Sequence, residues 1–398
     1  MAGKVGAGLG LAAGAVAGYV VREAVKALAS RNEDEQAVAR PASEGGSPAG
    51  PATTWPPPPA RPPHATGVSG AVPPAVVPPG ATGVRSGAGR AQAPPGPAGR
   101  SLVPPKAVPA CPPPPVIYQA SQLTALPWRL PTHPAPPGMA ADAARLGDLE
   151  VRAASLVGTG HRVDAEHAVP RQDAYRLGRD AASQHLVVAV ADGMSDSVHS
   201  DTAAAVAALA LVNALRAQLD EGVPLRGLDH ASAFLEAARQ VHTVARQRQW
   251  PDDSVRTVAA VAVVPTAPSP GGGRDVWIAG LGDTTAWVRR PRSWSRELGE
   301  KQQGFDAGRL HAYLPHTPEA AQGRHVRLQP GEALALTTDG VGDALTELPA
   351  AQELFHRQWA APVQPIDLLL HIAYDSHQRN DDRTAVVVWP PSPEGGQR

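Results

Sequence analysis

The sequence predicts an α+β domain over residues 145–391, with sheet packed on sheet and helices outside. Three observations support this prediction. Short apolar runs, each of strand length, recur between residues 186 and 389. Two consecutive helix-like segments interrupt these runs. The preceding segment is too rich in proline and too poor in large apolar side chains to form a core of its own.

Continuous apolar runs bounded by turn residues are typical of buried strands. The first run, LVVAVA at 186–191, stops at Asp192-Gly193, and a later run also ends in Asp-Gly. Three consecutive glycines at 271–273 predict a hairpin turn between the second and third runs. The predicted strands cover residues 186–191, 258–264, 276–281, 285–289, 333–337 and 384–389.

Helical spacing of apolar residues predicts three helices, at 202–219, 231–249 and 366–377. The first is rich in Ala and Leu, and Ser200, Asp201 or Thr202 is its candidate N-cap. Because two helices follow one another inside a succession of strands, the pattern favours α+β over a regular alternation of strand and helix.

A Pro/Gly/Ala-rich segment at 31–144 is predicted to be a disordered linker. The chain has 44 prolines, and 28 of them lie between Arg40 and Gly138. Such a segment favours extended polyproline II conformations, so we expect a spacer, with binding to SH3-like domains as the alternative. Residues 392–398 are expected to be a disordered tail.

Residues 1–30 contain an uncharged, Gly/Ala-rich run at 5–21. Gly6, Gly10, Gly14 and Gly18 would share one helix face, which is the small-residue pattern of closely packed membrane helices. One interpretation is a membrane anchor whose basic C-terminal flank puts the rest of the chain in the cytoplasm. The alternatives are a helix on another surface and the apolar part of a signal peptide.

The charge and the cysteine content limit which binding partners and which cellular compartment we expect for this chain. The 36 basic and 37 acidic residues give a net charge of −1, and no basic block marks a nucleic-acid surface. The single cysteine, Cys111, cannot form an internal disulfide, which suits a reducing compartment. We therefore expect a cytoplasmic protein that does not bind nucleic acid and whose membrane contact, if any, is through residues 5–21.

Four aspartates occupy similar local settings: Asp173, Asp192, Asp339 and Asp381. Several border an apolar strand, where a turn can direct a carboxylate into a shared cleft. Converging carboxylates repel one another, and a divalent metal is the usual remedy; oxygen ligands without a Cys or His cluster select Mg²⁺ or Mn²⁺. The alternative for any single Asp-Gly is an ordinary turn.

The motifs and their order resemble the PP2C-type (PPM) family of metal-dependent Ser/Thr protein phosphatases, bacterial branch. The similar segments, in chain order, are Gln172-Asp173-Ala174, Ala191-Asp192-Gly193-Met194, Arg256-Thr257-Val258, Gly282-Asp283-Thr284, Thr338-Asp339-Gly340 and Asp381-Asp382-Arg383-Thr384. The resemblance implies a PP2C-like αββα sandwich, in which two antiparallel sheets are flanked by helix pairs.

The same resemblance implies the site and its chemistry. Two Mn²⁺ or Mg²⁺ ions would be held by Asp173, Asp192 and the Gly193 carbonyl, with Asp192 as the bridge. Asp339 and Asp381 would complete one shell, and Asp283 would support the site or hold a third ion. A metal-activated water would attack the phosphorus of phosphoserine or phosphothreonine in line, without a phosphoenzyme intermediate.

Several positions depart from the family pattern. Ser195-Asp196 replace two glycines, and Ser200-Asp201, Arg171, Val255 and Asp382 are also substitutions. None removes a carboxylate ligand. The family's phosphate-binding arginine is not at its common spacing, so Arg162 or His161 is the candidate, against a surface arginine as the alternative. His199 is a candidate proton donor, and a solvated loop histidine is its alternative.

These observations leave three functions to weigh. The first is an active protein phosphatase that opposes a bacterial Ser/Thr kinase. The second is a catalytically weak relative that regulates a partner or binds phosphoproteins, which the altered loop after Asp192 favours. The third is an interaction protein that acts through its Pro-rich segment. A haloacid-dehalogenase phosphatase is disfavoured, because Met194 stands where that family needs a second aspartate.

Overall fold

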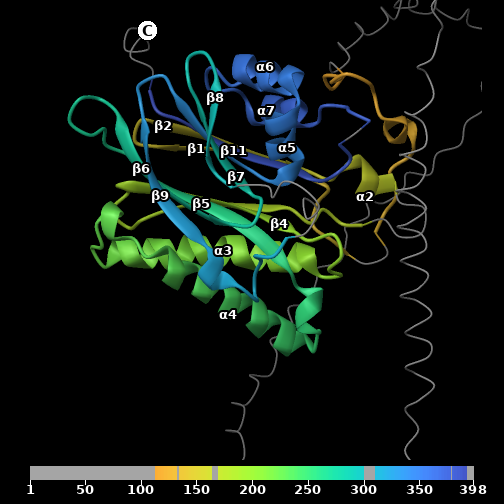
Figure 1. Cartoon of the computed structure of the whole chain (residues 1–398), viewed down its shortest axis with the longest axis horizontal. Helices are drawn as coiled ribbons and strands as arrows, with labels where there is room; N and C mark the ends of the chain where they lie inside the picture. Colours follow the sequence, from red (N-terminus) through yellow and green to blue (C-terminus); the bar gives the residue numbers. More distant parts are fainter. Residues whose placement is uncertain (1–112, 132–133, 164–168, 300–309, 378, 392–398) are drawn as a thin grey trace, which may run out of the picture. The chain divides into compact units, whose positions relative to one another are not determined.

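Two antiparallel sheets packed face to face form the centre of the fold, and helices cover both outer faces (Figure 1). The computed structural model describes residues 113–131, 134–163, 169–299, 310–377 and 379–391. The helix–sheet–sheet–helix arrangement confirms the predicted α+β sandwich of the PP2C type.

The first sheet has six strands in the order β1-β2-β11-β10-β7-β8. Its four inner strands are buried along most of their length, whereas the edge strand β1 is mostly exposed. The strands are β1 (Met139–Leu146), β2 (Leu149–Leu156), β7 (Thr285–Arg289), β8 (Trp294–Leu298), β10 (Ala333–Thr337) and β11 (Arg383–Trp389).

The second sheet has five strands in the order β3-β4-β5-β6-β9. Its two central strands, β4 and β5, are almost continuous runs of Val and Ala, because both of their faces are covered. The strands are β3 (Ala174–Arg179), β4 (His185–Gly193), β5 (Thr257–Pro265), β6 (Arg274–Leu281) and β9 (Gln322–Leu328).

Two long helices cover the five-stranded sheet, and three shorter helices cover the six-stranded sheet (Figure 1). The first pair is α3 (Ser200–Asp220) and α4 (His230–Arg248), and the second group is α5 (Asp339–Glu347), α6 (Pro349–Gln358) and α7 (Pro365–Ile372). A short helix, α2 (Thr159–Val163), and 3₁₀ turns, η1 (Gln122–Ala125), η2 (Leu225–Gly227), η3 (Asp252–Ser254) and η4 (Pro318–Ala320), complete the elements.

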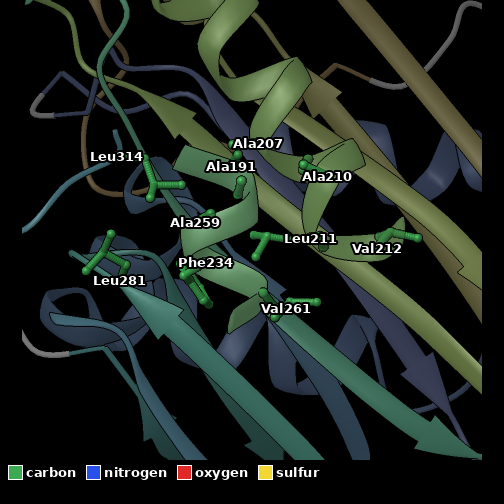
Figure 2. Close-up of a cluster of buried hydrophobic side chains, with 14 of the residues drawn as sticks. Ala191, Ala207, Ala210, Leu211, Val212, Phe234, Ala259, Val261, Leu281 and Leu314 are labelled. Atoms are coloured by element: carbon green, nitrogen blue, oxygen red, sulfur yellow. The ribbon is translucent and has the colours of Figure 1, made fainter. Parts of the chain in front are cut away.

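Successive side chains of a strand point to opposite faces of its sheet, and this alternation divides the apolar core into three layers. In β4, Val187, Ala189 and Ala191 face α3 and α4, whereas Val188 and Val190 face the other sheet. Figure 2 shows the helix-side layer, where Ala207 and Leu211 of α3 and Phe234 of α4 gather over Ala191, Ala259 and Val261. A third layer fills the space between the six-stranded sheet and α5–α7.

Helix α3 is the one helix among the described residues that is long and apolar enough to cross a membrane. Half of its most apolar window is buried inside the fold, against the five-stranded sheet and α4. Its apolar character therefore reflects its place in the core. The candidate anchor at residues 5–21 lies outside the described residues, as do the linker up to residue 112 and the tail at 392–398.

The six predicted strands correspond to β4, β5, β6, β7, β10 and β11, with bounds that differ by at most two residues. Two predictions about the helices were wrong. Helix α7 ends at Ile372, five residues early, because the chain then turns so that the Tyr374 hydroxyl can donate to the Gly340 carbonyl. The N-cap of α3 is His199, which makes no side-chain cap.

The expected linker at 31–144 extends too far, because the fold begins before residue 145. Strand β1 starts at Met139. Further upstream, residues 115–131, here called the strap, lie along the 375–380 loop: Ile117 N donates to Asp375 O at 2.8 Å, and His377 N donates to Gln119 O at 2.9 Å. Ile117 is buried in the third core layer, which fixes the strap to the domain despite its prolines.

Candidate metal centre

The five predicted metal-binding aspartates lie at one end of the two sheets. Asp173 directly precedes β3, and Asp192 is the second-last residue of β4. The antiparallel register pairs Ala174 with Ala191, so the start of β3 lies beside the end of β4. The sheet itself therefore brings these two carboxylates together.

The other three aspartates come from the ends of neighbouring strands. Asp283 lies in the turn between β6 and β7, Asp339 is the first residue of α5 just after β10, and Asp381 lies two residues before β11. Thr337 pairs with Thr285 on one side and with Ala385 on the other, so these three strand ends are adjacent.

Mutual electrostatic effects show that the five carboxylates form one group. The pKa of Asp192 lies well above its usual range, first through loss of solvent and then through the charges of Asp339, Asp173, Asp381 and Asp283. Asp339 is shifted in the same direction, again first by burial and then by Asp381 and Asp283. This raised pKa persists although Asp339 lies in the first turn of α5, where the helix dipole favours a negative charge.

Asp173 is the most deeply buried of the five, with 3% of its surface exposed. Its Oδ2 accepts hydrogen bonds of 2.7 Å from both Thr338 and Thr384, whereas its Oδ1 is buried without a hydrogen-bond partner. Burial and the neighbouring Asp382 raise its pKa to about 8, against the effect of the two threonines. A buried acceptor without a donor is uncommon, and a cation would satisfy it.

The loop that carries Asp381 is fixed by close backbone packing. Glycines at 158 and 340 flank it, and a Cβ at either position would overlap the backbone of residues 380–382. Asp382, which is 2% exposed, secures the loop further: its Oδ1 accepts from Gly158 N at 2.6 Å, and its Oδ2 accepts from Gln172 N at 2.5 Å. Asp382 thus ties the loop to the segment that carries Asp173.

Sequence reasoning missed this role of Asp382, which it treated only as a departure from the family pattern. Its partners Gly158 and Gln172 lie 224 and 210 residues earlier in the chain, so no local pattern connects them. The one available signal was its acidic character next to Asp381, directly before a buried strand.

His161 lies in the centre, on α2. Its Nδ1 is 2.9 Å from Asp382 Oδ1, and its Nε2 is 3.7 Å from Asp381 Oδ1. Burial lowers the pKa of His161, but the hydrogen bond with Asp382 and the charges of Asp382, Asp381 and Asp173 outweigh it and raise the pKa to about 9. His161, Asp381 and Asp382 could together hold a metal ion.

Arg162 has a different environment from its neighbour His161. Its guanidinium lies 4.4 Å from the ring centroid of Trp128 in the strap. After burial, the charges that most affect its pKa are those of Arg383 and Asp375 and not those of the five aspartates. Its predicted phosphate-binding role stays a prediction.

A second arginine, Arg171, was not considered as a phosphate ligand from the sequence, although the charges of two site carboxylates act on it. Its side chain is 9% exposed, its Nε donates to Pro137 O at 3.0 Å, and its Nη1 has no partner. Burial lowers its pKa, while the charges of Asp173 and Asp382 oppose that effect. It lines a cavity of about 480 Å³ between β1 and β3, together with Arg176 and Tyr175.

The loop after Asp192 is fastened to residues 251–256. Ser197 Oγ donates to Asp253 O at 3.1 Å, and Arg256 pairs with Asp196 at 3.0 Å. The ring of His199 stacks on Trp250, with the centroids 3.5 Å apart. The stacking favours a packing role for His199 over proton transfer. Gly193 ends β4 opposite Thr257, and its carbonyl stays a predicted ligand.

Divalent cations fit this arrangement. The carboxylates of Asp173, Asp192 and Asp339, whose pKa values are raised by burial and by their acidic neighbours, are stabilised when positive charge is placed among them, and Asp173 offers a buried oxygen without a donor. The donors are mostly carboxylate oxygens, which suit Mg²⁺ and Mn²⁺. Asp173, Asp192, Asp339 and Asp381, with Asp283 beside them, are the residues that would hold such ions.

Solved structures similar to this chain include bacterial phosphatases. The Mycobacterium tuberculosis Ser/Thr phosphatase PstP is 18% identical and covers 61% of this chain and 99% of its own, with a TM-score of 0.41. The Mycobacterium smegmatis phosphatase MsPP, in complex with cacodylate, is 16% identical and covers 64% and 99%, with a TM-score of 0.40. RsbX, in complex with magnesium, is 12% identical and covers 63% and 98%, with a TM-score of 0.39. No curated protein matches the chain.

The family comparison covers most of the site. The model of the protein phosphatase 2C family matches residues 157–368, more than half of the chain. The match begins just before α2 and includes four of the five aspartates; Asp381 lies beyond its end. With the αββα sandwich and the acidic centre at its edge, this match shows that the chain belongs to the protein phosphatase 2C family.

Proposed function

We propose that this protein is a metal-dependent phosphatase that hydrolyses phosphoserine and phosphothreonine in proteins. The observation that supports this most is the convergence of five carboxylates at one end of the sandwich, with the Oδ1 atom of Asp173 buried and without a donor. Family membership narrows the reaction to phosphate-ester hydrolysis. Two divalent cations, Mn²⁺ or Mg²⁺, are the proposed cofactors, with a third near Asp283.

The described residues have separable tasks in this reaction. When bound, such cations neutralise phosphate charge and make a water molecule nucleophilic at neutral pH. Asp173 and Asp192 would bind the cations at the centre, and Thr338 and Thr384 fix the Asp173 carboxylate through its Oδ2. Arg171 contributes positive charge beside Asp173, which favours the approach of a phosphate dianion. Asp382 fixes the loop that carries Asp381.

A phosphoprotein substrate follows from the family, and a bacterial-type Ser/Thr kinase is the proposed opposing enzyme. The proposed location is the cytoplasm, with residues 5–21 as the candidate membrane contact. The alternative, a weak or inactive regulatory relative, is supported by the loop after Asp192. There Ser195 and Asp196 replace the family's glycines, and Asp196 is held by Arg256.

The full chain should be assayed with p-nitrophenyl phosphate and with phosphoserine and phosphothreonine peptides, in Mn²⁺, in Mg²⁺ and in EDTA. Metal-dependent turnover that EDTA abolishes and Asp192→Asn strongly reduces supports the phosphatase proposal. A folded chain that binds Mn²⁺ but turns over neither type of substrate contradicts it and favours the regulatory alternative. The exposed Asp196→Asn variant is the matched control, because it also removes one carboxylate, four residues away in the loop that follows β4.

A further inference from the structure

The position of His161 is set by contacts that the proposed reaction does not use. Gly160 N, one residue earlier, donates to Asn380 O at 2.8 Å, and Thr159 Oγ1 donates to Asn380 Oδ1 at 2.7 Å. These bonds hold α2 against the loop that carries Asp381. The His161 side chain is 16% exposed and lies between Asp381 and Asp382.

The two ring nitrogens of His161 face different carboxylates. An ionised carboxylate only accepts hydrogen bonds, so Nδ1, 2.9 Å from Asp382 Oδ1, carries the hydrogen of that bond. Nε2 then faces Asp381 Oδ1 at 3.7 Å, too far for a good hydrogen bond. Two ligand atoms of one metal ion are separated by a similar distance, roughly 3–4 Å, when each metal–ligand bond is about 2.0–2.2 Å.

Asp382 has the contacts of an orienting residue. Both of its oxygens already accept backbone hydrogen bonds, from Gly158 N and Gln172 N, and Oδ1 also receives His161 Nδ1. Metal-binding histidines commonly donate their second ring nitrogen to such a carboxylate, which fixes the tautomer and aims the other nitrogen at the metal. This geometry leaves His161 Nε2 and the Asp381 carboxylate as the pair available to an ion.

A second observation at the same place independently indicates a cation. Asp173, which is 97% buried, leaves its Oδ1 without a partner, and its charge acts on His161 as well as on Asp192. One ligand atom from each of His161, Asp381 and Asp382 lies within 4.8 Å of the others, a spacing that could hold a metal ion.

We propose that His161 Nε2 is a ligand of one divalent ion that Asp381 also binds, with Asp382 as the residue that orients the imidazole. The inference rests on the proposed metal centre and adds a nitrogen to an otherwise oxygen-rich ligand set. Imidazole suits Mn²⁺ and other transition metals, whereas Mg²⁺ prefers oxygen. The centre should therefore bind Mn²⁺ in clear preference to Mg²⁺, and this preference should depend on His161.

The test is pulsed EPR on the full chain, titrated with Mn²⁺ from substoichiometric amounts to saturation. A histidine ligand gives nitrogen couplings in the Mn²⁺ signal, and ¹⁵N-labelling of histidine shifts them. We expect these couplings in the wild type and their loss in His161→Gln. The preference for Mn²⁺ over Mg²⁺, measured by calorimetry, should fall about 10-fold or more, as for other changes around metal-binding histidines.

The matched control is His185→Gln. His185 also pairs with an aspartate, its Nδ1 lying 3.0 Å from Asp180 Oδ2, but it begins β4 whereas Asp192 lies near the end of that strand. This variant should keep the couplings. The wild-type labelling experiment needs no substitution, so the proposal can be overturned even if His161→Gln does not fold.

The outcomes separate this proposal from the proposed function. Bound Mn²⁺ without histidine coupling at any point of the titration overturns the His161 ligand and leaves the phosphatase proposal intact. Couplings that persist in folded His161→Gln also overturn it. Nitrogen couplings from histidine without turnover of any substrate contradict only the proposed phosphatase activity. A chain that binds no Mn²⁺ contradicts both proposals.

Discussion

The two helical layers of the sandwich differ in the side chains that they bury. Helices α3 and α4, over Ser200–Asp220 and His230–Arg248, bury no charged side chain, and their core residues are mostly alanine, leucine and valine. The opposite layer contains buried charge. Asp343 of α5 pairs with Arg379 at 3.1 Å, and Arg383, 3% exposed, lies below α5 and α7.

Arg383 shows what this buried charge does. Its guanidinium lies 4.0 Å from the ring centroid of Tyr374 and donates to the carbonyls of Ile372, Tyr374 and Arg379. These carbonyls belong to the turn that leads from α7 to Asp381. One layer thus has an apolar core without buried charge, whereas the other adds to its apolar core polar contacts that position predicted metal-binding residues.

The largest effect should come from the apolar layer. Phe234→Ala removes a fully buried ring between α4 and the five-stranded sheet, and we expect the free energy of unfolding to fall by about 3–5 kcal/mol. Chemical denaturation measures this, with the half-exposed neighbour Leu235→Ala as control. If the division is correct, the Mn²⁺ affinity of the folded fraction stays close to that of the wild type.

Asp192→Asn tests the acidic centre, in contrast to the apolar layer. Removing one carboxylate from the centre should lower turnover by about 10²–10³-fold, the equivalent of several kcal/mol of transition-state stabilisation. The metal-free variant should be at least as stable as the wild type, because one member of a mutually repelling group is gone. A large loss of stability would show that Asp192 also supports the fold.

Arg383→Met should affect fold and site together. The substitution leaves three carbonyls without their charged donor, and we expect a loss of about 1.5–3 kcal/mol in stability. Mn²⁺ affinity should fall as well, since the turn before Asp381 loses its support. Arg357→Met on the exposed face of α6 is the control and should change neither quantity.

The pH dependence of stability should reveal the acidic centre directly. The native pKa of Asp173 is about 8, far above that of an aspartate in an unfolded chain, so the native state retains a proton that the unfolded state has lost. The resulting stability is complete below about pH 4 and lost as pH rises through 8. His161, with its pKa raised to about 9, contributes in the same direction at higher pH.

In differential scanning calorimetry, the melting temperature of the metal-free chain should therefore fall as pH rises between about 4 and 8. Saturating Mn²⁺ should reduce this slope, because a cation stabilises the ionised carboxylate. Asp173→Asn should reduce it without metal. A metal-free wild type whose stability rises over this interval would contradict the assignment.

The smallest effect is expected from His199→Ala. The ring stacks on Trp250, so its loss should cost about 0.5–1.5 kcal/mol of stability and change turnover by less than a factor of about three, since less than 1 kcal/mol of the barrier is involved. Stopped assays over a pH series would detect a proton donor. A loss of 100-fold, restricted to one limb of the pH profile, would restore His199 as a general acid.

Those parts of the fold that depend on local pattern could be predicted from the sequence. Strands β4 and β5 are continuous apolar runs, and Asp173, Asp192, Asp339 and Asp381 stand beside strands or turns that a single sequence reveals. Strand β9, with the sequence QGRHVRL, and the largely exposed β1 lack an apolar run of their own. Each becomes a strand by pairing with a neighbour, β6 or β2.

The site was only partly predictable for a related reason. Asp382, Arg171 and the strap acquire their roles through contacts with residues more than thirty and up to about 250 positions away. The prolines of the strap indicated a spacer, although its Ile117 is buried in the apolar core. Such roles depend on which surfaces come into contact after folding, and a local sequence pattern does not indicate these long-range contacts.

The strap has a thermodynamic consequence for the centre. Asp375 accepts hydrogen bonds from Ser121 N and Thr124 Oγ1, and Ser121 Oγ donates to Asn380, the residue before Asp381. Free-energy coupling between two events is reciprocal. If the proposed cation at Asp381 favours the attached strap, a ligand that prefers the strap detached weakens cation binding, and the bound cation weakens that ligand by the same factor. The stretch of chain leading into the domain would then act as an effector site for the proposed metal centre, although it supplies none of the predicted ligands.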